Sequence, residues 1–297
     1  MKIARFNGGR IGVVLADGVV DVTAAAGVQP SQWPPVGPVV MIRDFAARRP
    51  AMEVQARTGP RIPLSQVHFE TPVPWPHKLI AIPVNYEAHA VEMSSPAISR
   101  NAGFFMKSSA SLTGASDAIV LPDLPGREIH HEAELAVIIG KGGRHIDASQ
   151  ALDHVFGYAC LLDMTVRGKQ ERTIRKSYDT FTPVGPYITT ADEVGEPTDL
   201  QVTLWVNEQV RQDANTRKMF LSVAQIIEMC SAVTTLEPGD IIATGTSEGV
   251  GPVAPGDHVR ISISRVGEMV LKVAQGKRGA NVAIPHNLAP RTAEALS

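Results

Sequence analysis

Short apolar runs bounded by turn-forming residues recur along the chain and predict a series of β-strands. Near the amino terminus, three such runs are separated by Gly8-Gly9 and Asp17-Gly18, which are dipeptides typical of tight hairpin turns. The three runs cover residues 3–6, 11–15 and 19–22. This pattern predicts a small β-meander at the start of the chain.

The pattern then changes, and the change divides the chain. Residues 39–58 fit a helix that places Ile42 and Phe45 on one face. A proline-rich connector follows over residues 71–76, and we place a domain boundary there. We therefore expect a small N-terminal domain, a larger second domain and a loose polar tail. These cover residues 1–75, 76–280 and 281–297.

The most informative stretch is the apolar run Leu135–Ile139, which is entered from a polar sequence carrying Glu132 and Glu134. Side chains on a strand alternate between faces, so these two carboxylates point the same way, about 7 Å apart. A second apolar run, residues 155–162, ends on Asp163. Three oxygen ligands without a nearby cysteine suit Mg²⁺ first, then Mn²⁺ or Ca²⁺. From the residues alone, an acidic strand edge facing solvent remains the alternative.

Further apolar runs predict more strands in the second half of the chain. One helix is expected over residues 222–232, because Ser222 and Gln225 form the sequence pattern of a capping box. The 22 Pro and 25 Gly residues are scattered as turn punctuation, which favours short strands over long helices. The expected fold class is mainly β with some α, built as a mixed β-sheet roll. The additional strands are expected at residues 78–82, 117–122, 200–206, 209–212, 241–244, 259–263 and 269–273.

Composition excludes several classes of partner. The 297 residues are 44% apolar and carry a net charge of −2, which is typical of a globular protein. There is no basic block, so we expect no nucleic acid, and no apolar stretch long enough to span a membrane. The N-terminus lacks the apolar core of a signal peptide, and Cys160 and Cys230 both lie in apolar segments. We therefore expect a cytoplasmic location.

Four motifs occur in an order that resembles the fumarylacetoacetate hydrolase family. They are H-x-E-x-E-L-x-x-x-I-G, D-x-T-x-R-x-x-Q, K-S-x-D-T-F-x-P-x-G-P and T-G-T-x-x-G-V-G. Here they occupy residues 130–140, 163–170, 176–186 and 244–251, and the resemblance covers roughly residues 70–275. Each motif alone is a weak signal, but chance agreement of four in order is improbable. The resemblance favours metal binding by Glu132, Glu134 and Asp163.

The resemblance also implies catalytic residues. His89 and Glu92 are three residues apart, which is neighbour spacing on a helix, and they match a family block whose His–Glu dyad activates water. We expect residues 85–100 to form a mobile lid that carries this dyad. Lys176 is expected to stabilise oxyanions, and Arg167 and Gln170 are expected to face the substrate.

Two further residues are expected to bind substrate, and three positions depart from the family pattern. Lys107 follows an apolar run and could point into the site or lie on the surface. Thr246, with backbone N–H groups of its glycine-rich loop, could cradle a carboxylate.

Ser108 and Ser247 stand where prolines are common, and Gly168 stands where many relatives have Asp. Arg172 and Arg175 are expected to be solvated at the surface.

The resemblance implies a metal-dependent hydrolase that cleaves a C–C bond in a 2,4-dioxo acid of the acylpyruvate or fumarylpyruvate type, as a homodimer. Its products would be a carboxylate and pyruvate. The same metal-binding platform supports decarboxylation, enol–keto isomerisation and hydration of related 2-oxo acids, so these stay open as alternatives. A non-catalytic, metal-stabilised scaffold is the third hypothesis, and retention of His89, Glu92 and Lys176 argues against it.

Overall fold

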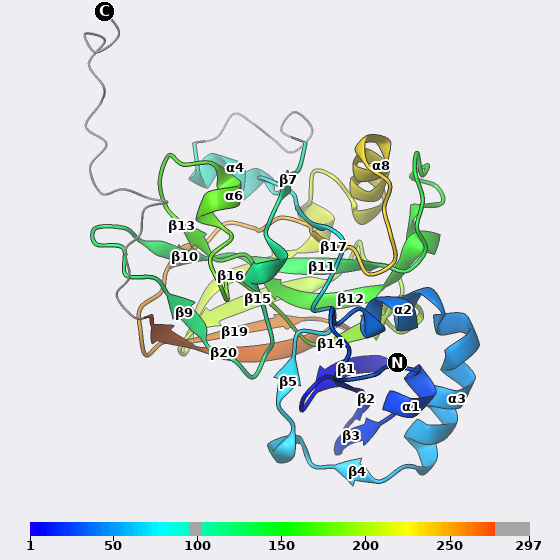
Figure 1. Cartoon of the computed structure of the whole chain (residues 1–297). Coiled ribbons are helices and arrows are strands. Elements are labelled where there is room, and N and C mark those ends of the chain that lie inside the picture. The colour runs from blue at the N-terminus through cyan, green and yellow to red at the C-terminus, as the bar shows by residue number, and fades with distance from the viewer. Residues whose placement is uncertain (95–102, 277–297) are drawn as a thin grey trace, which may run out of the picture.

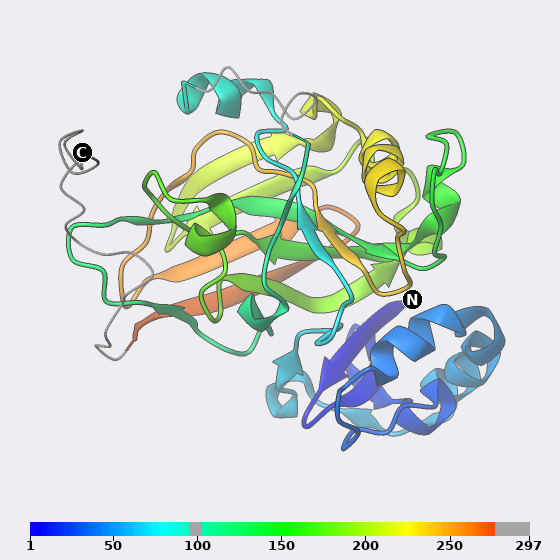
Figure 2. The same ribbon diagram turned by 45° about the horizontal axis from the view of Figure 1, so that its top comes forward.

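The computed structural model describes residues 1–94 and 103–276, and its architecture is β-rich with a few helices (Figures 1 and 2). The expected fold class, mainly β with some α, is confirmed. The described helices are α1 (Thr23–Ala26), α2 (Gly37–Arg43), α3 (Phe45–Thr58), α4 (Glu87–Glu92), α6 (Arg172–Arg175), α7 (Ala191–Val194) and α8 (Val223–Val233). The strands are β1 (Lys2–Phe6), β2 (Arg10–Leu15), β3 (Gly18–Asp21), β4 (Arg61–Ile62), β5 (Phe69–Glu70), β6 (Leu79–Ala81), β7 (Phe105–Met106), β8 (Leu112–Thr113), β9 (Ile119–Leu121), β10 (Ile129–His131), β11 (Ala133–Ile139), β12 (Val155–Leu162), β13 (Thr165–Val166), β14 (Thr182–Thr190), β15 (Gln201–Val206), β16 (Gln209–Asn215), β17 (Ile241–Ala243), β18 (Gly251–Pro252), β19 (His258–Ile263) and β20 (Gly267–Gln275).

The described strands form three sheets. The largest has twelve strands, ten of them in the order β4-β3-β2-β1-β14-β12-β11-β17-β6-β7, while β5 and β8 pair with β1 and β14. A five-stranded sheet has the order β16-β15-β19-β20-β9, and a small one has the order β13-β10-β18. Strands β11 and β12 are buried along their whole length, as a near-continuous apolar sequence requires. They position the polar residues at their ends.

The N-terminal meander is continuous with the rest of the molecule. Strand β1 pairs antiparallel with β14, with Lys2 opposite Thr189 and Ile3 opposite Ile188. One apolar cluster contains Ile3 of the meander together with Leu161 of β12. The meander and α3 lie at the lower right of Figure 1, beside the β14 end of the main sheet. The boundary at residue 75 therefore separates chain segments that share a sheet and a core.

The helix expected over residues 39–58 is in fact two helices, α2 and α3, separated at Asp44. The Asp44 N–H donates to Val40 O and closes α2, while Asp44 O accepts from the N–H groups of Ala47 and Arg48 and opens α3. The Asp44 carboxylate also binds Arg48. Apolar periodicity does not register such a break, because both helices bury the same kind of residue.

Helix α8 begins as expected. Ser222 Oγ accepts from Gln225 N, and Gln225 Oε1 accepts from Ser222 N, so the capping box is complete. The apolar side of α8 buries Ile226, Ile227 and Cys230 in the main core. No helix in the described part of the chain is long and apolar enough to cross a membrane.

Candidate active site

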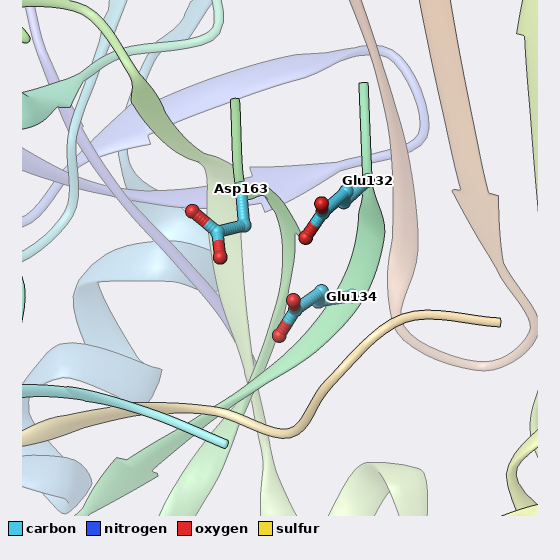
Figure 3. A group of neighbouring side chains, drawn as sticks. All are labelled: Glu132, Glu134 and Asp163. Carbon is cyan, nitrogen blue, oxygen red and sulfur yellow. The ribbon is translucent and has the colours of Figure 1, made fainter. Parts of the chain in front are cut away.

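Three acidic side chains meet where β11 and β12 pair. Ala133 is opposite Leu162 in this antiparallel ladder, so Glu132 and Asp163 are the flanking residues and Glu134 is one pair further in. The Asp163 N–H donates to Glu132 O at 2.9 Å, which extends the pairing by one step. One carboxylate oxygen from each of the three residues lies within 4.8 Å of the others, and all three residues are buried (Figure 3).

Three cationic side chains surround these carboxylates. Lys176 Nζ donates to Glu132 Oε2 at 2.7 Å, to Asp163 Oδ2 at 2.6 Å and to Thr165 Oγ1 at 2.6 Å. Lys107 Nζ, which is fully buried, donates to Asp163 Oδ1 and to Phe181 O. Arg167 Nη2 lies 3.3 Å from Glu132 Oε1. A buried charge needs such partners, because desolvation would otherwise be prohibitive.

The environment separates the pKa values of the two glutamates. Burial raises the pKa of Glu132, but Lys176 and Arg167 outweigh it and lower the pKa to about 2. Burial and the neighbouring Asp163 carboxylate raise the pKa of Glu134 well above its ordinary value, despite Lys176 and the hydrogen bond from Gly245 N. Glu132 is thus firmly ionised, while Glu134 resists ionisation until another positive charge approaches.

This donor set fits a hard divalent cation. It offers only carboxylate oxygens, which are the ligands of Mg²⁺ and Mn²⁺, and both cysteines are elsewhere. The pKa of Glu134 is raised by burial first and then by the Asp163 carboxylate, and a cation bound beside it would favour its ionised form. The residues present therefore fit the metal site that the sequence suggests.

The His–Glu pair is formed within α4. His89 Nδ1 lies 2.9 Å from Glu92 Oε2, and the Glu92 Oε1 atom accepts from Gly249 N at 3.0 Å. His89 is 4% exposed and lines the same cavity as the three carboxylates. When Nδ1 carries the proton donated to Glu92, Nε2 is left with its lone pair, which is what a general base requires.

The site cavity has a volume of about 260 Å³. It joins the carboxylates and His89 to Arg167, Lys176 and Thr246. Lys107 and Gln170, which we expected at the substrate, do not line it: Lys107 reaches Asp163 as described, and Gln170 Oε1 accepts from Arg127 Nη2 at 2.9 Å. The remaining lining residues are Ile82, Pro83, Val84, Met93, Phe105, Gly168, Arg172 and Arg175.

The expectation that Arg172 and Arg175 are solvated at the surface is wrong. Both line the cavity and are only partly exposed. Arg175 Nε donates to Gln170 O at 2.7 Å, and its Nη1 donates to Val166 O at 3.2 Å. The sequence pattern around α6 is polar throughout, and polarity alone does not say which cations turn inward.

The glycine-rich loop over residues 244–251 does hold carboxylates, but they belong to the protein itself. Gly245 N donates to Glu134 Oε2 at 2.6 Å, and Gly249 N donates to Glu92. Thr246 Oγ1 donates to Ala133 O at 2.9 Å and accepts from Gln212 Nε2 at 2.7 Å. The hydroxyl proton of Thr246 is therefore already committed to the strand that carries Glu134.

Gln212 is a structural residue of the site that sequence reasoning missed. It is buried on β16, and its Oε1 accepts from Ala133 N at 3.0 Å and lies 3.1 Å from His131 Nδ1. Its Nε2 donates to Thr246 and to Ser247 O. One amide thus joins the carboxylate strand, the histidine and the loop. A glutamine in a strand with four exposed residues gives no local sign of this role.

Gly168, a departure from the family pattern, is explained by Arg127. A Cβ at Gly168 would lie 1.7 Å from Arg127 Nη2, so a side chain would displace that guanidinium. Arg127 Nε donates to Arg167 O at 2.7 Å, which fixes the backbone beside the cavity. Of the lid expected over residues 85–100, residues 95–100 lie outside the described residues, as does the expected tail over 281–297.

The chain is similar to proteins of known family. Residues 78–274 match the model "Fumarylacetoacetate (FAA) hydrolase C-terminal". A maleylpyruvate hydrolase from Aquipseudomonas alcaligenes is 41% identical over 285 residues, which cover 92% of this chain and 99% of the relative. A human mitochondrial oxaloacetate tautomerase is 38% identical over 228 residues, covering 72% of each chain. The crystal structure of a maleylpyruvate hydrolase from Sphingobium sp. SYK-6, in complex with manganese(II) ion and pyruvate, superposes with a TM-score of 0.87 at 54% identity, covering 93% of this chain and all of that one.

Proposed function

Because the chain belongs to the fumarylacetoacetate hydrolase family, we propose that it is a metal-dependent hydrolase that cleaves the C3–C4 bond of a 2,4-dioxo acid of the acylpyruvate type, with maleylpyruvate as the first candidate. The observation that carries the proposal is the cavity, in which the carboxylate cluster, the lone pair of His89 and unpaired guanidinium donors come together. The two maleylpyruvate hydrolases named above cover 92% and 93% of this chain.

The reaction needs a base and an anion-binding group on the same side of the site. His89, held by Glu92, takes a proton from water, whose oxygen attacks carbon 4 of the substrate. The C3–C4 bond breaks, its electron pair stays on carbon 3, and the resulting enolate is protonated to pyruvate. The other product is the carboxylate derived from carbon 4. A divalent cation held by Glu132, Glu134 and Asp163 would supply Lewis-acid polarisation of the 2-oxo acid end of the substrate.

Arg167 is better placed than Lys176 to bind a substrate oxyanion. Its Nε and Nη2 atoms are buried and make no hydrogen bond among the described residues, although Glu132 balances part of the charge. Arg167 also lines the cavity with a side chain that is 21% exposed, so its guanidinium is available to a substrate carboxylate or oxyanion. Lys176, in contrast, has all three N–H donors engaged by Glu132, Asp163 and Thr165, and it reaches a substrate only by giving up one of them.

We propose Mg²⁺ or Mn²⁺ as the cation, a homodimer as the assembly and the cytoplasm as the location. The hard-oxygen donor set and the manganese complex of the Sphingobium relative support the choice of cation. The dimer and the location rest on the family resemblance and on the sequence. Light scattering coupled to size exclusion tests the dimer, with a mass near 31.8 kDa contradicting it.

His89→Ala tests hydrolysis against the alternative reactions. Removal of a positioned general base slows hydrolysis by about 10²–10⁴-fold. Decarboxylation of oxaloacetate involves no attack by water, so we expect it to fall much less in the same variant. The measurement is kcat/KM for maleylpyruvate, acetylpyruvate and oxaloacetate with Mg²⁺ or Mn²⁺, with products identified. Oxaloacetate tautomerisation is followed in parallel, because a relative carries that name.

Two outcomes would overturn the proposal. If His89→Ala kept full cleavage of the dioxo acids, the base would be elsewhere. If the wild-type protein tautomerised or decarboxylated oxaloacetate but cleaved no dioxo acid, the hydrolase assignment would fail. Thr58→Ala is the matched control, because this exposed residue on α3 is far from the site in the fold and its hydroxyl bonds only to Val54 O.

A further inference from the structure

Arg172 differs from the other cations of the cavity in having no bound partner. Lys176 is tied to Glu132 and Asp163, and Arg175 is tied to two backbone carbonyls. Arg172 lines the cavity, but its guanidinium makes no hydrogen bond or ion pair within residues 1–94 and 103–276. A cavity-lining guanidinium with five open donors is suited to bind a carboxylate in a bidentate manner.

We propose that Arg172 binds the distal carboxylate of the substrate, so that this protein prefers dicarboxylic 2,4-dioxo acids to simple acylpyruvates. The inference rests on the proposed function and names the substrate class of that same site. The 2-oxo acid end would be held at the carboxylate cluster and Arg167, and Arg172 would read the opposite end of the molecule.

The segment that carries Arg172 is held in place by hydrogen bonds. The Arg175 guanidinium donates to the carbonyls of Gln170 and Val166, so the two ends of the segment 166–175 are hydrogen-bonded to each other. Arg127 adds a bond to Arg167 O and another to Gln170 Oε1. Arg172 therefore projects from a fixed wall, and fixing it costs less conformational entropy than ordering a free loop on binding.

The charge balance of the cavity points the same way. Four cationic side chains line it (Arg167, Arg172, Arg175 and Lys176) against three carboxylates, and a bound divalent cation would add two more positive charges. A monoanionic acylpyruvate leaves more of this charge uncompensated than a dianion does. Such an excess in a partly enclosed site attracts dianions and raises their local concentration.

The rest of the lining supports a small, elongated acid. Ile82, Val84 and Phe105 supply apolar surface that suits a short carbon chain between the two acid groups. The volume of about 260 Å³ lies at the small end of ligand cavities, as a compact organic acid requires.

The kinetic test compares Arg172→Gln with wild type on maleylpyruvate and on acetylpyruvate, which lacks the distal carboxylate. Loss of one charge-assisted contact should lower kcat/KM for maleylpyruvate by about 10- to 100-fold, mostly through KM. The fall in kcat/KM for acetylpyruvate should be smaller by a factor of about ten or more. Arg57→Gln is the control, because Arg57 is exposed on α3, outside the cavity, and its guanidinium also makes no hydrogen bond or ion pair among the described residues. Equal losses on both substrates, or none, would overturn the inference.

A binding test decides the matter even if the protein proves not to be a hydrolase. The probes are 2-oxoheptanedioate and 2-oxoheptanoate, which have equal length, differ in the distal carboxylate and lack the 4-oxo group needed for cleavage. With Mn²⁺ present, calorimetry should show that Arg172→Gln weakens binding of the diacid by about 10- to 100-fold and of the monoacid by about threefold or less. A variant that binds both probes as wild type does would sink the assignment of Arg172, whatever reaction the site performs.

Discussion

At the scale of single residues, the site is governed by how each charge is compensated. Lys107 and Arg167 illustrate the difference, since both were expected to contact substrate. Burial lowers the pKa of Lys107, while Asp163 supports its charge, and its ammonium has no access to the cavity. Arg167 lines the cavity, and its Nε and Nη2 atoms make no hydrogen bond among the described residues. Of the two, only Arg167 can exchange a protein partner for a substrate without leaving a buried charge unpaired.

Glu134→Gln tests the metal site with little disturbance of the fold. Because the pKa of Glu134 is raised well above its ordinary value, a neutral amide of the same shape should leave the stability of the metal-free protein unchanged or slightly increased. Affinity for Mg²⁺ and Mn²⁺, measured by calorimetry, should fall by about tenfold or more, since a carboxylate ligand is lost. Glu128→Gln, a change at an exposed carboxylate bound to His130, is the control. Unchanged metal affinity in Glu134→Gln would place the ion elsewhere.

His131 makes a prediction about pH. Burial lowers its pKa from 6.5 to about 4, because Nε2 is buried without a partner and cannot bear a proton at low cost. A depressed pKa means that the unfolded state binds the proton more readily. The stability is therefore fully present above pH 6.5 and is lost as pH falls toward 4, by roughly 3 kcal/mol for this group.

The check is urea unfolding of wild type and His131→Asn between pH 4 and 7. The asparagine amide can still donate toward Gln212 Oε1, but it does not titrate. The variant should show a visibly smaller drop in the free energy of unfolding across this range. Identical pH profiles would mean that other groups account for the whole acid sensitivity.

At the scale of elements, the loop over residues 244–251 links helix α4 to the carboxylate strands. Gly249 adopts φ +90°, and a Cβ there would lie 1.9 Å from Arg211 O. Its N–H fixes Glu92, which orients His89. Backbone that must approach another backbone this closely admits only glycine.

Gly249→Ala should therefore lose activity beyond its effect on stability. The loop must shift away from Arg211, which moves the N–H from Glu92, and we expect kcat to fall by about tenfold or more. Gly256→Ala is the matched control, because Gly256 has φ +97° but a Cβ there would meet nothing within 4 Å. That variant should lose about 1 kcal/mol of stability and keep its kcat. Assays well below both melting temperatures separate the effects, and equal kcat values for the two variants would contradict the linkage.

The sequence predicted elements best where their causes are local. The capping box of α8 and the strand β12, which Asp163 directly follows, are predicted by residues a few positions apart. The split between α2 and α3 was missed, because it depends on backbone bonds at Asp44 and leaves the apolar pattern unchanged. Gln212 and Arg172 were missed for a different reason. Their surroundings come from strands and loops distant in sequence, and no periodicity encodes them.

At the scale of the whole molecule, the meander and the strands beside the site belong to one continuous sheet. The amino-terminal ammonium donates to Thr190 Oγ1 at 2.6 Å and pairs with Glu193, so the first residue is fastened to the end of β14. Strand β14 in turn pairs with β12, which Asp163 directly follows. The small N-terminal segment is thus joined through β14 to the strands beside the acidic cluster. Figure 2 shows this segment, in blue, packed beside the rest of the molecule from a second direction.

This continuity predicts a single cooperative unfolding transition. Trp33 and Trp75 contact each other, with ring centroids 5.4 Å apart, near the connector to the second domain, whereas Trp205 lies in β15 of the five-stranded sheet. Urea unfolding of Trp205→Phe reports on the first pair, and unfolding of the double variant Trp33→Phe/Trp75→Phe reports on Trp205. If the shared sheet and core couple the parts, both probes should give one midpoint once small differences in stability are allowed for.

Weakening the seam should then destabilise both probes together. Ile188 is 1% exposed, pairs with Ile3 across the β1–β14 ladder and belongs to the core that the meander shares with β12. Ile188→Ala should lower the free energy of unfolding by about 2–5 kcal/mol at both reporters, because it opens a cavity in that core. Val233→Ala, at a side chain 66% exposed on α8, should shift either midpoint by less than about 0.5 kcal/mol. If Trp33 and Trp75 instead reported an earlier transition that alone responded to Ile188→Ala, the N-terminal segment would be an independently folding domain. The boundary at residue 75 would then separate two parts that unfold independently, although they share a sheet.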